Sequence, residues 1–152
     1  MSALNELYQE MIIDHGRRPR NFYISEQANA IQEGFNPLCG DKLTIYLTEK
    51  NGVVENVSFQ GSGCAISMAS ASLMTEAMKG KSVEEVKKLF DIFHKIMMGE
   101  KNPDALEALG KLSVLTGVAE FPSRVKCATL AWHTLMGALK HQTKIISTED
   151  EK

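Results

Sequence analysis

The sequence predicts an α+β domain in which a small antiparallel β-sheet of about three strands packs against several α-helices. Three features lead to this prediction: a helical pattern near the N-terminus, two alternating segments joined by an Asn-Gly pair, and a series of helical patterns after them. Strands grouped ahead of most helices, without βαβ alternation, are typical of this class. We expect residues 1–152 to form a single domain, because a chain of this length can bury a sizeable core.

The N-terminal segment predicts a helix followed by a loosely structured region. Over residues 4–15, apolar side chains recur at three- and four-residue steps, which is the pattern of an amphipathic helix. Gly16 and Pro19 are expected to end this helix. Residues 28–34, which come next, have weak strand character.

A β-hairpin is the clearest element in the sequence. Residues 42–49 and residues 53–60 both alternate between apolar and polar side chains. Asn51 and Gly52 stand between them, and this pair accepts the positive φ angles that a tight hairpin turn requires. We therefore expect two antiparallel strands.

Helical patterns fill the rest of the chain. A helix is expected from Cys64 to about Lys79, and the capping box Ser82-Val83-Glu84-Glu85 begins the next one. A shorter helix should begin near Asn102, and the last should cover about residues 124–143. Residues 144–152 are polar and are expected to form a frayed, flexible tail.

Composition narrows the class of protein. With 17 basic and 19 acidic residues, the chain is not expected to bind nucleic acid. No segment approaches the roughly 18 apolar residues of a membrane span, and the N-terminus does not resemble a secretion signal. We therefore expect a cytoplasmic protein with reduced thiols. The basic stretch Arg17-Arg18-Pro19-Arg20 is either a solvated loop or a docking patch for an acidic partner surface.

Three cysteines are the candidate functional residues, and their odd number means that they cannot all pair as internal disulfides. Because the hairpin reverses at its Asn-Gly turn, Cys39, Asp41 and Cys64 should lie at one end of the sheet. Cys127 is expected in the first turn of the last helix, and it joins them if that helix begins at the same end. Helix beginnings favour thiolates, which would apply to Cys64 and Cys127.

Three thiolates and one carboxylate make a tetrahedral ligand set that suits Zn²⁺. The alternative is that each cysteine is a small buried apolar residue, and the spacing alone does not exclude this. Histidine is a competing ligand: His15 is interpreted as a cation at a helix end. His133 lies about 240° around the helix from Cys127 and should face away from it.

The chain resembles the SufU/IscU family of iron–sulfur cluster assembly proteins over nearly its whole length. The resemblance is carried by four segments: Asp14-His15 with Pro19-Arg20-Asn21, Asn36-Pro37-Leu38-Cys39-Gly40-Asp41, Gly61-Ser62-Gly63-Cys64-Ala65-Ile66-Ser67, and Lys126-Cys127-Ala128-Thr129-Leu130-Ala131-Trp132. IscU-type scaffolds usually carry histidine where Lys126 stands, and their segment between the second and third cysteines is shorter. Both departures indicate the SufU subgroup.

The resemblance implies a zinc-dependent sulfurtransferase of iron–sulfur cluster biogenesis. In that interpretation Cys39, Asp41, Cys64 and Cys127 bind zinc, and Cys39 accepts persulfide sulfur from a SUF-type, pyridoxal-phosphate-dependent cysteine desulfurase. Lys126 would steady the developing anion or pair with Asp41, and downstream iron–sulfur assembly components would receive the sulfur. Two alternatives stay open: a scaffold that carries a transient Fe–S cluster on the same thiols, and a structural zinc domain that only binds a partner.

Overall fold

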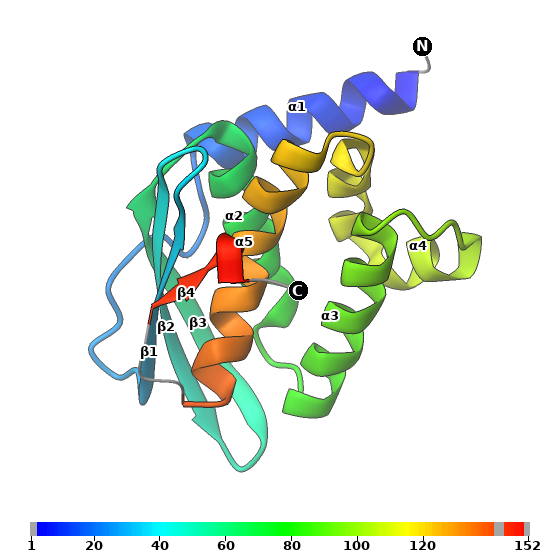
Figure 1. Ribbon diagram of the computed structural model, residues 1–152. Coiled ribbons are helices and arrows are strands. Elements are labelled where there is room, and N and C mark those ends of the chain that lie inside the picture. Colours follow the sequence, from blue (N-terminus) through cyan, green and yellow to red (C-terminus); the bar gives the residue numbers. More distant parts are fainter. Residues whose placement is uncertain (1–2, 142–144, 151–152) are drawn as a thin grey trace.

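The computed structural model describes residues 3–141 and 145–150, and it has the predicted α+β architecture (Figure 1). Helices α2 (Ala65–Met78) and α5 (Pro122–Leu139) cover one face of a four-stranded sheet. Helix α1 (Ala3–Arg17) packs against α2, while α3 (Val83–Met97) and the short α4 (Pro103–Leu109) lie on the far side of α5 from the sheet. A 3₁₀ helix, η1 (Gly110–Val118), leads into α5.

The sheet has the order β3-β2-β1-β4. Strands β1 (Ala30–Asn36), β2 (Asp41–Lys50) and β3 (Val53–Ser62) are consecutive and antiparallel, whereas β4 (Ile146–Ser147) runs parallel to β1. The class prediction is confirmed, and the expectation of about three antiparallel strands is close. The fourth strand went unpredicted because two residues are too few to show alternation.

The predicted hairpin forms between β2 and β3. Its turn residues Asn51 and Gly52 have φ angles of 54° and 77°, which is the left-handed conformation expected of this pair. The register places Lys42 opposite Ser62 and Asn36 of β1 opposite Asp41. One end of the sheet therefore gathers the β1–β2 loop and the β3–α2 junction.

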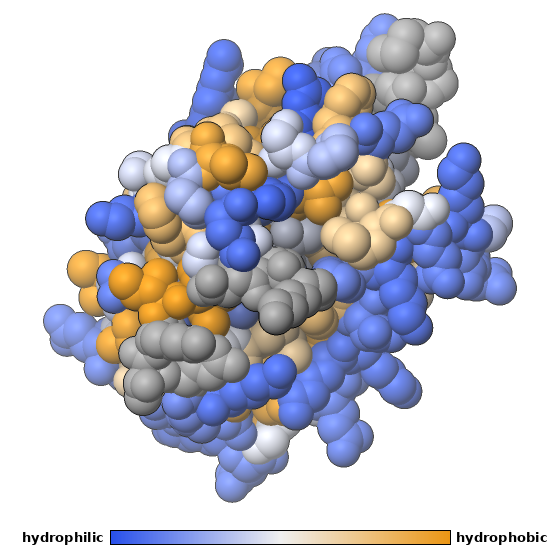
Figure 2. All heavy atoms as spheres, viewed as in Figure 1, coloured by the Kyte–Doolittle hydropathy of each residue, from blue (hydrophilic) through white to orange (hydrophobic). Residues whose placement is uncertain are grey.

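Strand β1 alternates in the sense opposite to that of an ordinary half-buried strand. Its inward positions are Gln32, Gly34 and Asn36, and its outward positions include the exposed Ile31 and Phe35. Figure 2 shows hydrophobic side chains at the surface on the left of the molecule, where Figure 1 places the sheet. This inversion explains why the sequence of residues 28–34 has only weak strand character. Strand β1 ends at Asn36, two residues beyond the expected end at residue 34.

On the side of α5 away from the sheet, large side chains close the core between α3 and α5. The rings of Phe93 and Trp132 stack with centroids 4.0 Å apart and bring α3 against α5. The Ser82 capping box at the start of α3 is present, with both reciprocal hydrogen bonds. None of the helices within residues 3–141 and 145–150 has the length and apolar character of a membrane span.

The C-terminal elements differ from the expected boundaries. Helix α5 begins at Pro122, two residues before the predicted start, and ends at Leu139, while the predicted end at Thr143 lies outside the described residues. Of the segment 144–152, expected to be a flexible tail, residues 145–150 are described. They form β4 and the 3₁₀ turn η2 (Thr148–Asp150), which lie against β1. Residues 144, 151 and 152 lie outside the description, so the flexibility of the tail stays a prediction.

Gly34 allows β1 to approach α5 closely, and we predict that Gly34→Ala destabilises the fold. A Cβ atom there would overlap the hydroxyl of Thr134, so the free energy of unfolding should fall by about 1–3 kcal/mol. Urea denaturation measures this change. Adding Thr134→Ala should restore part of the loss, and a Gly34→Ala variant as stable as the parent would contradict the prediction.

Candidate metal site

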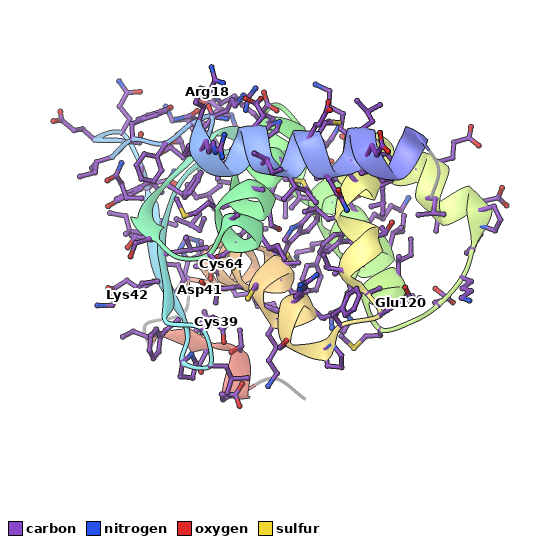
Figure 3. The ribbon with its side chains drawn as sticks, turned by 90° about the horizontal axis from the view of Figure 1, so that it is seen from above. Arg18, Cys39, Asp41, Lys42, Cys64 and Glu120 are labelled. Atoms are coloured by element: carbon purple, nitrogen blue, oxygen red, sulfur yellow. The ribbon has the colours of Figure 1, made fainter. Side chains whose placement is uncertain are left out.

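Two backbone junctions and one helix meet at the end of the sheet where the thiols gather. Figure 3 shows Cys39, Asp41 and Cys64 together at this end, with the C-terminal turn η2 beside them. Cys39 lies in the loop between β1 and β2, and Cys64 lies between β3 and α2. Cys127 comes from α5, so the expected approach of that helix to the same end is found.

Asp41 is the central polar group of the site, and its side chain is fully buried. Its Oδ1 accepts a hydrogen bond from the backbone amide of Cys64 at 2.9 Å. Its Oδ2 accepts one from Nδ2 of Asn36 at 3.0 Å. Buried carboxylates need such compensation, because an unpaired charge in the interior is costly. Both donors also fix the direction in which the carboxylate faces.

Gly63 leaves the space that this arrangement needs. A Cβ atom at this position would lie 2.5 Å from Oδ1 of Asp41, far inside contact distance. Only a residue without a side chain therefore lets the carboxylate reach the Cys64 amide. The Gly-Ser-Gly segment before Cys64 serves this approach as well as ending the strand.

The three thiols occupy three different environments. Cys39 is exposed, Cys64 is half-buried and Cys127 is buried. The Sγ atoms of Cys39 and Cys127 are 3.3 Å apart, a hydrogen-bonding distance much longer than the roughly 2.05 Å of a disulfide. Cys64 is the N-cap of α2, and its Sγ accepts a hydrogen bond from the Ser67 amide at 3.4 Å.

The environment of Cys127 differs from the expectation. Because α5 begins at Pro122, Cys127 lies in the second turn and not at the helix beginning, so the helix-dipole argument holds for Cys64 alone. Burial first, and then hydrogen bonds with Cys39 and Cys64, raise the pKa of the Cys127 thiol well above its ordinary value. Without a metal this thiol is neutral at physiological pH, and a bound cation would have to displace its proton.

Cys39, Asp41 and Cys127 form a group that could hold a metal ion. One ligand atom from each lies within 4.8 Å of the other two. Cys64 is outside this compact set, but its amide bonds Asp41 and its thiol contributes to the hydrogen bonding of Cys127. Sulfur donors with one carboxylate suit a soft divalent ion such as zinc better than magnesium or calcium.

Histidine does not join this group. His15, interpreted from sequence as a cation at a helix end, is instead buried, with Nδ1 2.7 Å from the Ser72 hydroxyl. Burial, followed by the positive charge of Arg20, lowers its pKa and favours the neutral ring. His133 packs its ring against Phe90 and His94, and burial lowers its pKa to about 4. His15 therefore takes part in hydrogen bonding within the core, and His133 packs against neighbouring rings, in the described structure.

Three of the basic residues singled out by the sequence have carboxylate partners: Lys126, Arg18 and Arg20. Lys126 donates to Glu149 at 2.6 Å, so the suggested pairing of Lys126 with Asp41 is not found. The hydrogen bond to Lys126 lowers the pKa of Glu149. Arg20 binds Asp14 at 2.7 Å, and Arg18 lies 3.6 Å from the same carboxylate. In Figure 3 Arg18 lies just after the end of α1, well apart from the labelled cysteines.

The sequence matches the NifU-like N terminal domain family over residues 7–128. The chain belongs to this family. The resemblance to iron–sulfur cluster assembly proteins inferred from the cysteine motifs is thereby confirmed.

Individual relatives carry two kinds of name. The chain is 40% identical over 151 residues to the iron–sulfur cluster assembly scaffold protein IscU of Streptococcus pyogenes serotype M1, covering 99% of this chain and 94% of that one. It is 41% identical over 132 residues to the zinc-dependent sulfurtransferase SufU of Bacillus subtilis, covering 87% and 88%. A solved candidate scaffold protein for the SUF system from Fervidobacterium islandicum has a TM-score of 0.81 at 33% identity, covering 89% and 98%.

In the sequence, Asn36 and Gly63 stand within the cysteine motifs without a predicted role at the site, and Thr148 is not among the candidate residues. Asn36 bonds both Asp41 and Cys127, and the hydroxyl of Thr148 in turn bonds Asn36. The Asn-Pro-Leu-Cys-Gly-Asp segment does signal a side chain that caps a turn, because asparagine commonly bonds the backbone amide two residues on. No local signal marks Thr148, which lies 112 residues away from its partner.

We predict that Gly63→Ala weakens metal binding without unfolding the protein. The added methyl group should push Asp41 away from the Cys64 amide and spoil the orientation of one donor. Outer-sphere changes of this kind typically cost about 10- to 100-fold in metal affinity. Competition with a chelator of known zinc affinity measures the change.

Gly117→Ala is the matched control, because an added Cβ at Gly117 would meet no described heavy atom within 4 Å. Its zinc affinity should equal that of the parent. If Gly63→Ala and Gly117→Ala both bind zinc as tightly as the parent, the contact between Gly63 and Asp41 does not matter for metal binding.

Proposed function

We propose that this protein is a zinc-dependent sulfurtransferase of iron–sulfur cluster biogenesis. Cys39 accepts persulfide sulfur from a pyridoxal-phosphate-dependent cysteine desulfurase of the SUF type and passes it on to downstream assembly components. The observation that carries the proposal is the contrast within one donor group: the thiol of Cys39 is exposed on a short loop, while Asp41 and Cys127 beside it are buried. The name of the Bacillus subtilis relative supports the zinc and the activity.

The proposed zinc ligands are Cys39, Asp41, Cys64 and Cys127. When bound, zinc would hold the thiols as thiolates and protect them from oxidation. The chain's own residues shape the site: Asp41 is oriented by two hydrogen bonds, and Cys64 faces the amino end of α2. Cys39 is the donor best placed to leave the group, because it lies on a loop of residues 37–40 and contacts solvent.

The loop is built to present this thiol. The Gly40 amide donates to the Asn36 carbonyl at 2.8 Å and closes the turn, and Gly40 itself has a φ of 73° that favours glycine. The two strands fix both ends of the loop through the Asn36–Asp41 pair. Cys39 therefore projects from a short, anchored loop toward an approaching partner, and its own backbone needs little rearrangement.

The transfer step is a thiol–persulfide exchange. The Cys39 thiolate attacks the terminal sulfur of the cysteine persulfide on the desulfurase, forming one S–S bond while the original S–S bond breaks. The desulfurase cysteine leaves as a thiolate and Cys39 becomes the persulfide, so the exchange balances without an external oxidant or reductant. Lys126, which precedes Cys127 on α5 and pairs with Glu149, would steady the negative charge.

The partner and compartment follow from this role. A desulfurase must bring its persulfide to Cys39, and Arg17, Arg18 and Arg20 on and after α1 are candidates for its docking. Asp14 already engages Arg18 and Arg20, so Arg17 is the arginine with the greater freedom to meet an acidic surface. We expect the protein to act in the cytoplasm, with no nucleic acid and no membrane among its partners.

Cys39→Ala tests the proposal directly. Adding the parent protein to its desulfurase with cysteine and a reductant should raise the rate of sulfide release strongly, and Cys39→Ala should abolish the increase. Leu38→Ala, which alters the exposed neighbour in the same loop, should retain it. Mass spectrometry should find one added sulfur atom on Cys39. Stimulation that survives in Cys39→Ala would refute the proposed role.

A scaffold for cluster assembly is the second candidate, and the IscU names of relatives at 40% identity favour it. Elemental analysis of the purified protein separates the two, because we expect stoichiometric zinc and no iron. Anaerobic reconstitution with iron and sulfide should yield no stable coloured cluster. A cluster that forms on these thiols and transfers to an apo-protein would support the scaffold instead. A purely structural zinc domain would show no loss in Cys39→Ala beyond instability.

A further inference from the structure

Asn36 connects more parts of the site than any metal donor does. It is the last residue of β1, and its side chain is fully buried. Its Nδ2 donates to Asp41 at 3.0 Å and lies 3.6 Å from the Cys127 sulfur. Its Oδ1 accepts from the Leu38 amide at 3.2 Å and from the Thr148 hydroxyl at 3.1 Å. One side chain thus contacts two proposed zinc ligands and the loop that carries a third.

The orientation of this amide follows from its partners. The Leu38 backbone N–H can only donate, so the atom that faces it must be the oxygen of Asn36. The NH₂ group then points toward Asp41 and Cys127, both of which can accept. Thr148 donates to the same oxygen and locks the side chain from the other side.

The segment that carries Thr148 is docked at four points. Strand β4 pairs with β1 through Ile146 and Ser147. The side chain of Ile146 lies over Gly137 of α5, where an added Cβ would be 2.9 Å from its Cδ1 atom. Thr148 is 4% exposed and bonds Asn36, and Glu149 pairs with Lys126. The ion pair joins η2 to the residue that precedes Cys127.

We infer that Asn36 and Thr148 are positioning residues of the metal site: Asn36 orients Asp41 and Cys127, and Thr148 clamps Asn36 from the C-terminal segment. The inference rests on the proposed function, because it assigns these residues to the zinc ligands proposed above. Neither residue touches the sulfur that is transferred. Their effect is on how firmly the ligand group is held.

The physical effect of the clamp is to keep the anchored donors in place while Cys39 comes and goes. Without Asn36, Asp41 would keep the Cys64 amide but lose its side-chain amide donor, and the carboxylate could rotate away from a cation. Cys127 would lose the nearest amide donor to its sulfur. Outer-sphere partners of this kind typically change metal affinity by about 10- to 100-fold. Loss of the clamp should therefore speed zinc release.

Thr148→Val tests this inference, because valine keeps the shape of threonine and removes the hydroxyl. Zinc transfer from the loaded protein to an excess of a chromophoric chelator should accelerate about fivefold, the effect of one neutral hydrogen bond. Asn36→Ala should accelerate it by about 10- to 100-fold. Thr148→Ser, which retains the hydroxyl, should release zinc at the parent rate. In cobalt(II)-loaded protein, Thr148→Val should also shift the visible absorption bands.

Thr129→Val is the matched control. Thr129 is 5% exposed and lies on α5 near Cys127, but its hydroxyl bonds the Val125 carbonyl and not the site. It should lower stability without changing the zinc release rate. A parent rate in Thr148→Val, or an equal acceleration in Thr129→Val, would overturn the clamp.

The two proposals fail in different ways, because zinc release is measured without a desulfurase. If Thr148→Val accelerates zinc release but the protein accepts no sulfur, the clamp is supported and only the proposed function is refuted. If the protein is an active sulfurtransferase but Thr148→Val releases zinc at the parent rate, only the clamp is refuted. A protein that binds no zinc would overturn both.

Discussion

The structure depends on a fully buried carboxylate at the end of its sheet. An ionised group in the interior is tolerated only when hydrogen bonds or a cation compensate for lost hydration. Asp41 has two donors, one from the end of β1 and one from the start of α2. To supply both, the chain needs the Asn36–Asp41 register, a residue without a side chain at Gly63 and a sharp strand-to-helix junction. The hairpin and α2 are therefore fixed relative to each other by one polar centre.

Around this centre, the three cysteines differ in their surroundings and therefore in their chemistry. Exposure gives Cys39 access to a partner, the N-cap position gives Cys64 a helix amide, and burial keeps Cys127 protonated in the absence of a cation. Burial and the helix amide have opposite effects on thiol acidity. A set of thiols with graded environments can hold an ion firmly through some members while one member exchanges, and this gradation supports sulfur transfer over permanent structural binding.

Much of the fold could be predicted because its signals are local. The Asn51-Gly52 turn and the Ser82 capping box depend on neighbouring residues alone, and both are confirmed. Once the hairpin is known, the closeness of Cys39, Asp41 and Cys64 follows from strand direction. The start of α5 was misplaced by two residues, although Pro122 at the first helical position is a recognised signal.

The remaining features depend on tertiary contacts that no local pattern reveals. Strand β1 points polar residues inward because α5 and the candidate metal site lie there, so its alternation in the sequence does not indicate a half-buried strand. Strand β4 has two residues and gains its identity only by pairing with β1. The links from Thr148 to Asn36 and from Glu149 to Lys126 bridge distant segments, and the role of Lys126 stays a prediction.

The position of Thr148 late in the sequence affects the order in which the parts of the site are synthesised. A ribosome delivers this polypeptide from its amino end, so every thiol emerges before the threonine that braces Asn36. A nascent molecule could thus capture an ion early and loosely, and it would hold the ion more firmly only when the segment that carries Thr148 reaches the folded body. Maturation of the centre would then wait for the synthesis of this segment, and products truncated before Thr148 would release their ion first.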